Sequence, residues 1–483
     1  MGTVGITLLS ILGVLVILLG AAAIHALTIK AKRVPDKSAI SFTEEEKRKY
    51  AETLSALIRV PSISHEPNQS LEVFDTLHKV MAERFPLVHE KLELHEFEGS
   101  RLYIWRGKNP DLQPIVLMGH QDVVPAEELN WQHPPFSGVI LGDLINGRGA
   151  MDCKCTLTAE LCAVEELLSD GFVPERDVYI STSNDEEASG NGTKMIVEYL
   201  KSKGIRTASA LDEGGAILKG VLPGMNSESA MIGVVEKGFM DVKLTAKGHG
   251  GHSSTPPKNN PMARLCAFVN YMEKHKPFRL YMAKPVREMF TDLAPYLSFP
   301  MRFLFGNLWL FRPLATQLMP IVSPYGRALL STTFVCTMCG GSSASNVIPD
   351  AAYVVCNLRP ALHQACDESL EIIKRIAKRF DLEVEVLLSH SPSPVTDTNG
   401  EAFAYLASCV RACFPNVGTA PYYMCGGTDC GRYADVTDSC LRFAAIRMTP
   451  EQVAAMHSAN ESIGVTALAE SVKFYKYYII NHP

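Results

Sequence analysis

The chain has 483 residues, of which 47% are hydrophobic and 20% are charged. This composition is typical of a folded protein with a full core, and the length suits two or three domains. The formal net charge of −6 provides no basic field, so we expect no nucleic-acid partner.

An uncharged apolar stretch, Val4–Leu27, lies near the start of the chain. About 20 apolar residues are enough to cross a bilayer, so this stretch predicts one transmembrane helix or signal anchor within residues 1–30. The basic residues Lys30, Lys32 and Arg33 follow it. Because basic flanks tend to stay inside, we expect a single-pass membrane protein whose remaining chain faces the cytoplasm. A cleaved signal peptide, with an extracytoplasmic location, is the alternative.

Helix and strand patterns alternate after a polar linker at residues 31–43. The expected elements are amphipathic helices at Thr43–Arg59 and Leu71–Phe85 and a strand pair at Val88–Glu98 and Leu102–Arg106. Further strands and helices alternate downstream. The pattern predicts an α/β domain, with a central mixed sheet flanked by helices, built from residues 44–235 and 392–483.

Residues 236–391 have a different order of elements, which is strand, helix, strand, strand, helix, strand. This order is that of a ferredoxin-like α+β sandwich, so we expect a lid or dimerisation domain inserted into the α/β domain. The expected strands are Phe239–Gly248, Ser331–Gly341, Ala351–Leu362 and Leu382–Leu388, and the expected helices are Pro261–Lys274 and Cys366–Phe380.

An apolar excursion, Phe290–Ser323, interrupts this predicted lid. Its Phe, Leu and Met residues favour an extension of the core, and an acyl-chain pocket or a membrane-lying helix are the alternatives. Arg302, Arg312 and several prolines break the stretch, so we do not expect it to cross a membrane.

Acidic and histidine side chains recur just beyond short apolar runs of the predicted α/β domain. The segments are MGHQDVVP at Met118–Pro125, GRGAMDCK at Gly147–Lys154, NDEEASG at Asn184–Gly190, LDEGG at Leu211–Gly215 and MHSANE at Met456–Glu461. Strand ends of an open α/β sheet converge on one crevice. We therefore expect five side chains to meet there: His120, Asp152, Glu187, Asp212 and His457. This mixture of imidazole and carboxylate suits zinc and similar divalent metals, and the count suits two metals that share one ligand.

The acidic residues of these segments can be assigned different roles in metal binding and catalysis. Asp122 lies two residues beyond His120, close enough to hold the second imidazole nitrogen and so fix which nitrogen meets the metal. Asp152 has two carboxylate oxygens and can bridge two metals. If the backbone is extended at Glu186 and Glu187, their side chains point to opposite faces. Glu187 can then bind metal while Glu186 acts as the base. The alternative is that both acids form the solvated first turn of a following helix.

In this order the five segments resemble those of the di-zinc peptidases that include carboxypeptidase S, aminoacylase and succinyl-diaminopimelate desuccinylase, from about Phe42 to the C-terminus. LDEGG, GHGGHSSTPP at Gly248–Pro257 and SASNVIP at Ser343–Pro349 are most similar to the carboxypeptidase S and N-acyl-amino-acid hydrolase branch. The resemblance implies hydrolysis of the amide bond of a short peptide or an N-acyl amino acid. It also implies two zinc ions as cofactors, with cobalt or manganese as substitutes.

The resemblance further implies a ligand set. His120, Asp152 and Asp212 would hold one zinc, and Asp152, Glu187 and His457 the other, with Glu186 as general base. Family members differ over which residue of LDEGG reaches the metal, so we assign Asp212 and keep Glu213 as the second choice. A cis peptide bond between Asp152 and Cys153 is also implied.

The expected substrate-binding groups come from the lid and from GGTDCGRY. His252 matches the family's GHSS histidine, which donates to the carbonyl oxygen and, in dimeric relatives, comes from the partner subunit. The resemblance thus leaves two alternatives open, which are a homodimer through the lid and closure of the lid within one chain. Asn346 and Arg359 match positions that bind the substrate carbonyl and carboxylate. Gly427 and Thr428 can offer backbone donors. Many relatives have a basic residue where this chain has Gly431, with Arg432 following.

A rival hypothesis is a membrane-anchored binding protein that keeps the fold without the chemistry. Loss of Glu186 or of a metal ligand would have favoured it. Every expected ligand is present, so the sequence favours an enzyme.

Overall fold

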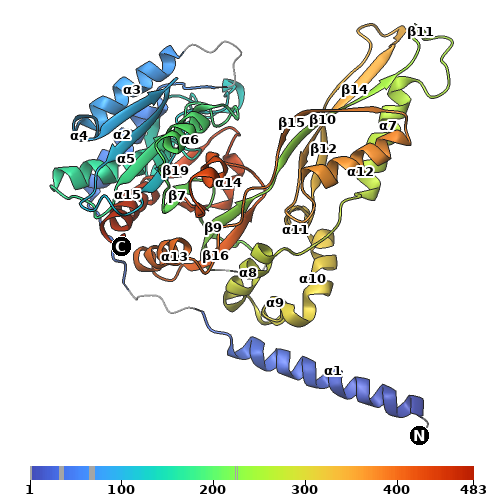
Figure 1. Cartoon of the computed structure of the whole chain (residues 1–483), viewed down its shortest axis with the longest axis horizontal. Helices are drawn as coiled ribbons and strands as arrows, with labels where there is room; N and C mark the ends of the chain where they lie inside the picture. The colour runs from blue at the N-terminus through green and yellow to red at the C-terminus, as the bar shows by residue number, and fades with distance from the viewer. Residues whose placement is uncertain (1–2, 32–36, 65–70, 223–224, 226) are drawn as a thin grey trace.

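The computed structural model describes residues 3–31, 37–64, 71–222, 225 and 227–483. Residues 32–36 of the predicted linker are therefore not described, and Lys32 and Arg33 lie outside the described residues. Figure 1 shows a larger lobe, a smaller elongated lobe and an N-terminal helix that projects from them.

The projecting helix is α1 (Thr3–Thr28), with 26 residues and no Lys, Arg, Asp or Glu. It is the one helix in the described part of the chain that is long and apolar enough to cross a membrane, a test that a signal sequence also passes. Most of its side chains are exposed, and the two buried ones, Ala22 and Ala26, lie near its C-terminal end.

A mixed sheet of ten strands forms the centre of the larger lobe. Its order is β1 (Glu93–Phe97), β2 (Ser100–Trp105), β6 (Val178–Thr182), β3 (Ile115–Met118), β7 (Ser209–Asp212), β17 (Cys440–Arg442), β9 (Glu228–Glu236), β8 (Ile217–Lys219) and β18 (Arg447–Met448), with β16 (Gly418–Met424) paired to β9. Strand β3 runs parallel to both β6 and β7, and every residue of these three strands is buried. Parallel strands need cover on both faces, which explains their continuous apolar runs.

Helices provide that cover. They are α2 (Glu44–Ile58), α3 (Glu72–Arg84), α4 (Pro86–Lys91), α5 (Lys154–Ser169), α6 (Gly192–Ser202), α13 (Glu401–Cys413), α14 (Pro450–Ala455) and α15 (Val465–Ile480). The first of these begins with a capping box, in which Thr43 and Glu46 satisfy each other's backbone amides. The largest core joins α2, α5, α13 and α15 to the sheet, and a separate core lies beneath α6. Three short strands, β4 (Val139–Leu141), β5 (Leu144–Asn146) and β19 (Ser462–Gly464), form a small sheet beside them.

The smaller lobe has the predicted ferredoxin-like order. Its antiparallel sheet runs β12 (Thr333–Gly340), β14 (Ala351–Arg359), β10 (Phe239–Lys247) and β15 (Glu383–His390). Helices α7 (Pro261–His275) and α12 (Cys366–Lys378) pack on one face and share a separate core with the sheet. A two-stranded extension, β11 (Gly251–His252) with β13 (Val347–Ile348), lies at its far tip (Figure 1).

The apolar excursion leaves the predicted lid and joins the larger lobe. Together with the residues on either side of it, the excursion forms α8 (Lys284–Leu293), α9 (Phe299–Phe305), α10 (Leu308–Val322) and α11 (Pro324–Leu330). Val286, Met289, Phe290 and Leu293 are buried in the core of the larger lobe. The predicted lid range of 236–391 thus contains a segment that packs outside the small sandwich. The apolar density of this segment fits the extended core that we expected.

One predicted strand starts too early. The structure has helix α4 through Lys91, and strand β1 begins only at Glu93. Pro86 opens that helix, and the carboxylate of Glu165 accepts hydrogen bonds from the backbone amides of Leu87 and Val88. This contact from α5 favours a helix where the apolar pattern alone suggested a strand.

Candidate metal centre

The carboxyl ends of three adjacent parallel strands provide most of the site. His120 follows β3 by two residues, the Glu186–Glu187 pair follows β6, and Glu213 follows β7 directly. Parallel strands end at the same edge of a sheet, so these side chains are brought together even though they are far apart in sequence. Asp152 comes from the loop before α5 and His457 from the loop after α14.

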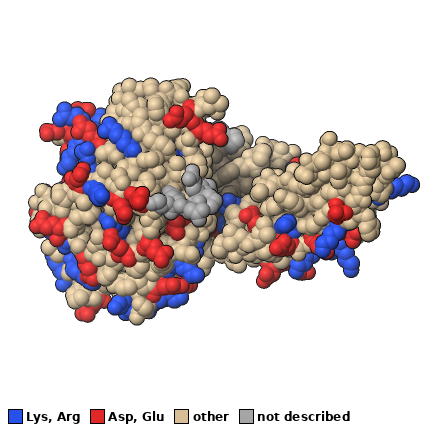
Figure 2. All heavy atoms as spheres, turned by 90° about the horizontal axis from the view of Figure 1, so that it is seen from above, with Lys and Arg blue, Asp and Glu red and all other residues tan. Residues whose placement is uncertain are grey.

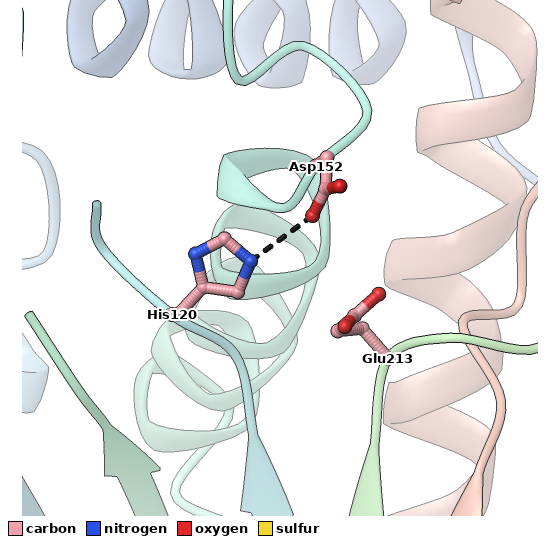
Figure 3. A group of neighbouring side chains, drawn as sticks. All are labelled: His120, Asp152 and Glu213. Atoms are coloured by element: carbon pink, nitrogen blue, oxygen red, sulfur yellow. Dashed lines mark hydrogen bonds and ion pairs between the residues drawn. The ribbon is translucent and has the colours of Figure 1, made fainter. Parts of the chain in front are cut away.

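His120, Asp152 and Glu213 form the first group (Figure 3). Each offers one ligand atom, and these atoms all lie within 4.8 Å of one another. His120 Nε2 lies 3.0 Å from Asp152 Oδ1, and the Glu213 carboxylate lies across the same space.

Asp152, Glu187 and His457 form the second group. His457 Nε2 lies 2.9 Å from Asp152 Oδ2 and 3.2 Å from Glu187 Oε1. Asp152 thus belongs to both groups and turns a different oxygen toward each histidine. The peptide bond between Asp152 and Cys153 is cis, as predicted.

The chemistry of these atoms fits divalent metal ions. Glu187 Oε1 is buried and has no hydrogen-bond partner among the described residues, although an imidazole nitrogen faces it. Burial, reinforced by Asp152 and Asp212, raises the pKa of Glu213 well above its ordinary value. Carboxylates crowded together in a buried place repel one another and leave acceptor atoms unsatisfied, and a cation relieves both costs.

The structure places Glu213, rather than the assigned Asp212, with the metal-ligating atoms. The carboxylate of Asp212 accepts hydrogen bonds from the backbone amides of Cys430, at 2.8 Å, and Glu213, at 2.9 Å. Asp212 is the last residue of β7, and its buried side chain is occupied in holding the neighbouring loop. The next residue, Glu213, reaches the first group. The second choice from the sequence is therefore the one that the geometry favours.

Asp122 has the orienting position expected of it. Nδ1 of His120 lies 3.0 Å from the backbone oxygen of Asp122 and 3.3 Å from its Oδ1. The same carboxylate accepts hydrogen bonds from the backbone amides of Glu186 and Glu187. One buried acid thus fixes the His120 ring and the loop that carries the two glutamates.

Glu186 and Glu187 lie in a tight turn, and the extended step predicted for them is wrong. The turn still separates the two side chains, because only Glu187 joins a metal-ligating group. Burial raises the pKa of Glu186 well above its ordinary value. Arg432 supports the turn from outside by donating to the backbone oxygens of Ser189 and Gly190. Arg432 follows Gly431, where the family pattern is broken.

Glu461 also takes part in the site, although it was not among the residues predicted from the sequence. Its carboxylate is fully buried, accepts hydrogen bonds from the backbone amides of Met151 (2.7 Å) and Asp152 (3.1 Å), and pairs with the Arg148 guanidinium at 2.5 Å. These contacts hold the loop that presents Asp152. The signal was available, because Glu461 closes the MHSANE segment.

The expected substrate-binding residues of the lid are not brought to the metal-ligating groups. His252 is exposed on β11, where Nδ1 lies 2.8 Å from Ser254 Oγ, and Asn346 lies in the adjoining loop. Arg359 ends β14 and stacks on Phe239. Figure 1 shows β11 at the tip of the smaller lobe, turned away from the larger one.

Thr428 already donates hydrogen bonds within the protein. Its backbone amide and hydroxyl both donate to Glu236 Oε1, and the same oxygen accepts a hydrogen bond from Arg442. Gly427 precedes Thr428 in the same loop. If Gly427 carried a Cβ, the nearest heavy atom to that Cβ would be Glu236 Oε2, at 4.0 Å. Gly427 therefore keeps open space that a ligand can enter.

An apolar cavity of about 230 Å³ adjoins the first group. Glu213 forms part of its wall, as do Met151 and Met456, the neighbours of Asp152 and His457. Most of the remaining wall is apolar, including Ala216, Leu218, Val221, Met231, Met289 and Ala444. The cavity can therefore receive a hydrocarbon group attached to a bond held at the metal-ligating atoms.

Charge on the molecular surface is mixed. Figure 2, which views the molecule from above, shows Lys and Arg interspersed with Asp and Glu over the larger lobe. This face carries no field of a single sign.

Comparison with known proteins gives one family. The family model described as Peptidase family M20/M25/M40 matches residues 116–481, which include all five segments. The Mus musculus protein named N-fatty-acyl-amino acid synthase/hydrolase PM20D1 is 34% identical over 460 residues, covering 93% of this chain and 90% of that protein. Probable carboxypeptidase S-like 2 of Dictyostelium discoideum is 34% identical over 424 residues, covering 86% of this chain and 81% of that protein.

Solved structures share the fold. The M20 family metallo-carboxypeptidase Sso-CP2 from Sulfolobus solfataricus aligns with a TM-score of 0.63 and 20% identity, covering 90% of this chain and 99% of that chain. This likeness confirms the predicted α/β fold.

Proposed function

Since the chain belongs to peptidase family M20/M25/M40, as its five segments predicted, we propose that it hydrolyses the amide bond of N-acyl amino acids at a two-zinc centre. The observation that carries the proposal is Asp152, which is shared by two metal-ligating groups beside an apolar cavity.

We assign the metal ligands from the two groups. His120, Asp152 and Glu213 would hold one zinc, and Asp152, Glu187 and His457 the other. Zinc bound there would supply Lewis acidity, which acidifies water and polarises the amide carbonyl. Cobalt or manganese can occupy similar ligand sets.

Glu186 is assigned as the general base. It belongs to neither metal-ligating group, so its carboxylate is free to exchange a proton with water, and burial raises its pKa well above the ordinary value. Glu186 removes a proton from the attacking water, whose oxygen forms the new bond to the carbonyl carbon. As the C–N bond breaks, Glu186 returns that proton to the leaving amine. Asp122 keeps the Glu186 loop and the His120 ring in place.

The apolar cavity favours a substrate with an acyl group on the nitrogen of the amino acid. A hydrocarbon chain placed there loses contact with water, at about 0.8 kcal/mol per buried CH₂. The PM20D1 relative, whose name specifies N-fatty-acyl-amino acids, supports this choice. The second candidate is a carboxypeptidase that acts on short peptides, which the name of the Dictyostelium discoideum relative supports.

We propose that His252, Asn346 and Arg359 complete the site when the lid closes or when a second copy supplies its lid. A histidine donor can stabilise the carbonyl oxygen as it gains charge, and an arginine can pair with the free carboxylate. His252 and the neighbouring Asn346 lie at the tip of the smaller lobe, so they need one of these two movements to reach the metal-ligating groups.

We also propose that α1 anchors the protein in a membrane. Lys30 follows the helix together with Lys32 and Arg33, and basic residues at that end favour a cytoplasmic location for the two lobes.

A hydrolysis screen tests the proposed function. The purified chain, supplied with zinc or cobalt, is given N-acyl amino acids of increasing chain length and a matched set of dipeptides. We expect kcat/KM to rise with acyl length and to exceed that for dipeptides. Faster turnover of dipeptides would favour the carboxypeptidase, and no turnover of either class would overturn the proposal.

A cavity variant sharpens the screen. Val453 lines the cavity and is 41% exposed, so a larger side chain fits there without disturbing the core. Val453→Trp should lower kcat/KM for long-chain substrates about tenfold while sparing N-acetyl substrates. Val453→Ala, the matched control, should leave both nearly unchanged.

A further inference from the structure

Helices α9 and α10 and the start of α11 expose large apolar side chains. We call this set the apolar ledge, and its members are Phe299, Trp309, Leu314, Leu318, Ile321, Val322 and Tyr325. Ile321 is 80% exposed and Val322 78%. A contiguous exposed set of this kind marks an interaction surface, whereas single exposed apolar residues are ordinary.

The stretch of chain that contains the ledge carries only positive charges. No Asp or Glu occurs between Asp292 and Asp350, a stretch that holds Arg302, Arg312 and Arg327. An apolar face with Trp, Phe and Leu and only basic charges is typical of helices that lie in the interfacial region of anionic bilayers.

The ledge is tied to α1 through Asn307, the residue before α10. Asn307 is fully buried, and its Nδ2 donates to the backbone oxygen of Ala22 at 3.0 Å. Its Oδ1 lies 3.0 Å from His25 Nδ1 and also accepts a hydrogen bond from the Trp309 indole. Figure 1 shows α9 beside the last turns of α1. The end of α1 and the ledge therefore lie at the same level.

The position of these contacts along α1 matches the surface of a membrane that α1 would cross. The contacts lie near residues 22–26, so about 18 residues of α1 project before them, which is roughly 27 Å at 1.5 Å per residue. The hydrocarbon core of a bilayer is about 30 Å thick. If these residues cross the bilayer, Asn307 and Trp309 lie where the hydrocarbon meets the headgroups, which is the depth that Trp prefers.

We propose that the apolar ledge lies in the surface of an anionic lipid bilayer, beside the point where α1 leaves it. The apolar side chains of the ledge enter the acyl region, and the arginines of the same stretch face the headgroups. The ledge adds apolar contact to the single anchor and fixes how the larger lobe faces the membrane.

The ledge also leads to the cavity. Tyr325, the last member of the ledge, lines the cavity together with Met289 of α8, and the Tyr325 hydroxyl donates to Tyr422 at 2.7 Å. If the proposed function holds, a long-chain substrate can pass from the bilayer to Glu213 without crossing water. This last step rests on the proposed function, whereas contact with the bilayer does not.

Fluorescence quenching tests the bilayer contact without any turnover. The full chain is reconstituted in vesicles of phosphatidylcholine and phosphatidylserine, with brominated acyl chains in half of the samples. Trp105 and Trp131 lie in the larger lobe, so the difference between wild type and Trp309→Phe isolates the signal of Trp309. We expect brominated lipid to quench at least half of that signal.

Three outcomes would overturn the proposal. Trp309 quenched by aqueous acrylamide and not by brominated lipid would place the ledge in water. Trp309 protected from both quenchers, together with crosslinking between copies, would place a second chain there instead. In Ile321→Asp/Val322→Asp, lipid quenching of Trp309 should fall severalfold; unchanged quenching would also count against the proposal.

An activity arm separates the two hypotheses. The same double variant should hydrolyse a water-soluble N-acetyl amino acid at the wild-type rate and a vesicle-borne long-chain substrate several times more slowly. Loss of both activities would indicate misfolding, which the circular dichroism spectrum would reveal. If the wild type hydrolyses neither substrate while Trp309 is quenched by lipid, the proposed function fails and the bilayer contact stands.

Discussion

Asp152 lies between two histidines, with Oδ2 2.9 Å from His457 Nε2 and Oδ1 3.0 Å from His120 Nε2. Two imidazoles on opposite oxygens of one carboxylate suit a bridging ligand between two metal ions. The surrounding residues then have separable tasks, which matched substitutions can distinguish.

The first pair of variants separates proton transfer from metal binding. Glu186→Gln should lower kcat by at least about 10²-fold because a general base is lost, while the metal content stays at the wild-type level. Glu187→Gln should lower metal affinity because a ligand atom is lost. Activity and metal content by mass spectrometry are measured on the same samples. Equal, modest losses in both variants would show that the two roles are wrongly divided.

The second pair tests the change of ligand within LDEGG. Glu213→Gln should reduce metal content, since Glu213 contributes an atom to the first group. Asp212→Asn should retain the metal and lower the midpoint of thermal unfolding instead, because its carboxylate accepts the backbone amides of Cys430 and Glu213. The opposite pattern, with metal lost only from the Asp212 variant, would restore the original assignment.

The sequence predicted which segments meet at the candidate centre more reliably than it predicted the backbone of those segments. Apolar runs mark β3, β6 and β7 clearly, so the convergence of His120, Glu187 and the LDEGG segment followed from the topology. The choice between Asp212 and Glu213 depends on where β7 ends, and strand ends are the least certain part of a prediction. A hydrogen bond from Cys430, about 220 residues downstream, decides it, and no local pattern contains that contact.

The same limit applies to other corrected elements. Periodicity could not distinguish the turn at Glu186 and Glu187 from an extended step, because the backbone amides that Asp122 holds are invisible to side-chain patterns. The apolar excursion was predicted inside the lid by its position in the chain. Helix α8, which carries the first residues of the excursion, packs with β16, a strand formed after residue 417.

The third prediction concerns His252 and the lid. His252→Ala should lower kcat more than it raises KM, because a donor to the developing oxyanion acts mainly in the transition state. Mixing this variant with Glu186→Gln tests the source of the histidine. Recovered activity would mean that one chain supplies His252 to the other's Glu186. Absence of recovery, with subunit exchange shown by a fluorescent label, would leave closure within one chain.

The fourth prediction concerns stability and pH. Burial lowers the pKa of His78 to about 4. The Nε2 atom of His78 lies 2.7 Å from Oε1 of Gln121, the residue that follows His120. The unfolded chain binds a proton near pH 6.5 and the folded chain does not, so the free energy of unfolding falls as pH drops from about 6.5 toward 4. The loss attributable to His78 should approach about 3 kcal/mol.

Urea unfolding of the wild type and of His78→Gln measures that loss. The difference between the two chains should change between pH 7.5 and pH 4.5, because only the wild type has this group to protonate. Other titrating groups contribute to both chains and cancel. A difference that is constant across this range would show that His78 titrates normally in the folded protein.

The most direct test of the two-metal centre is a zinc titration of chelator-stripped protein, followed by metal analysis and by hydrolysis of an N-acyl amino acid. We predict that the wild type binds two zinc ions per chain and that amide hydrolysis returns only as zinc is restored. Asp152→Asn should bind fewer than two ions and remain inactive. Full activity of the stripped wild type, or two tightly bound ions in an active Asp152→Asn variant, would contradict the account.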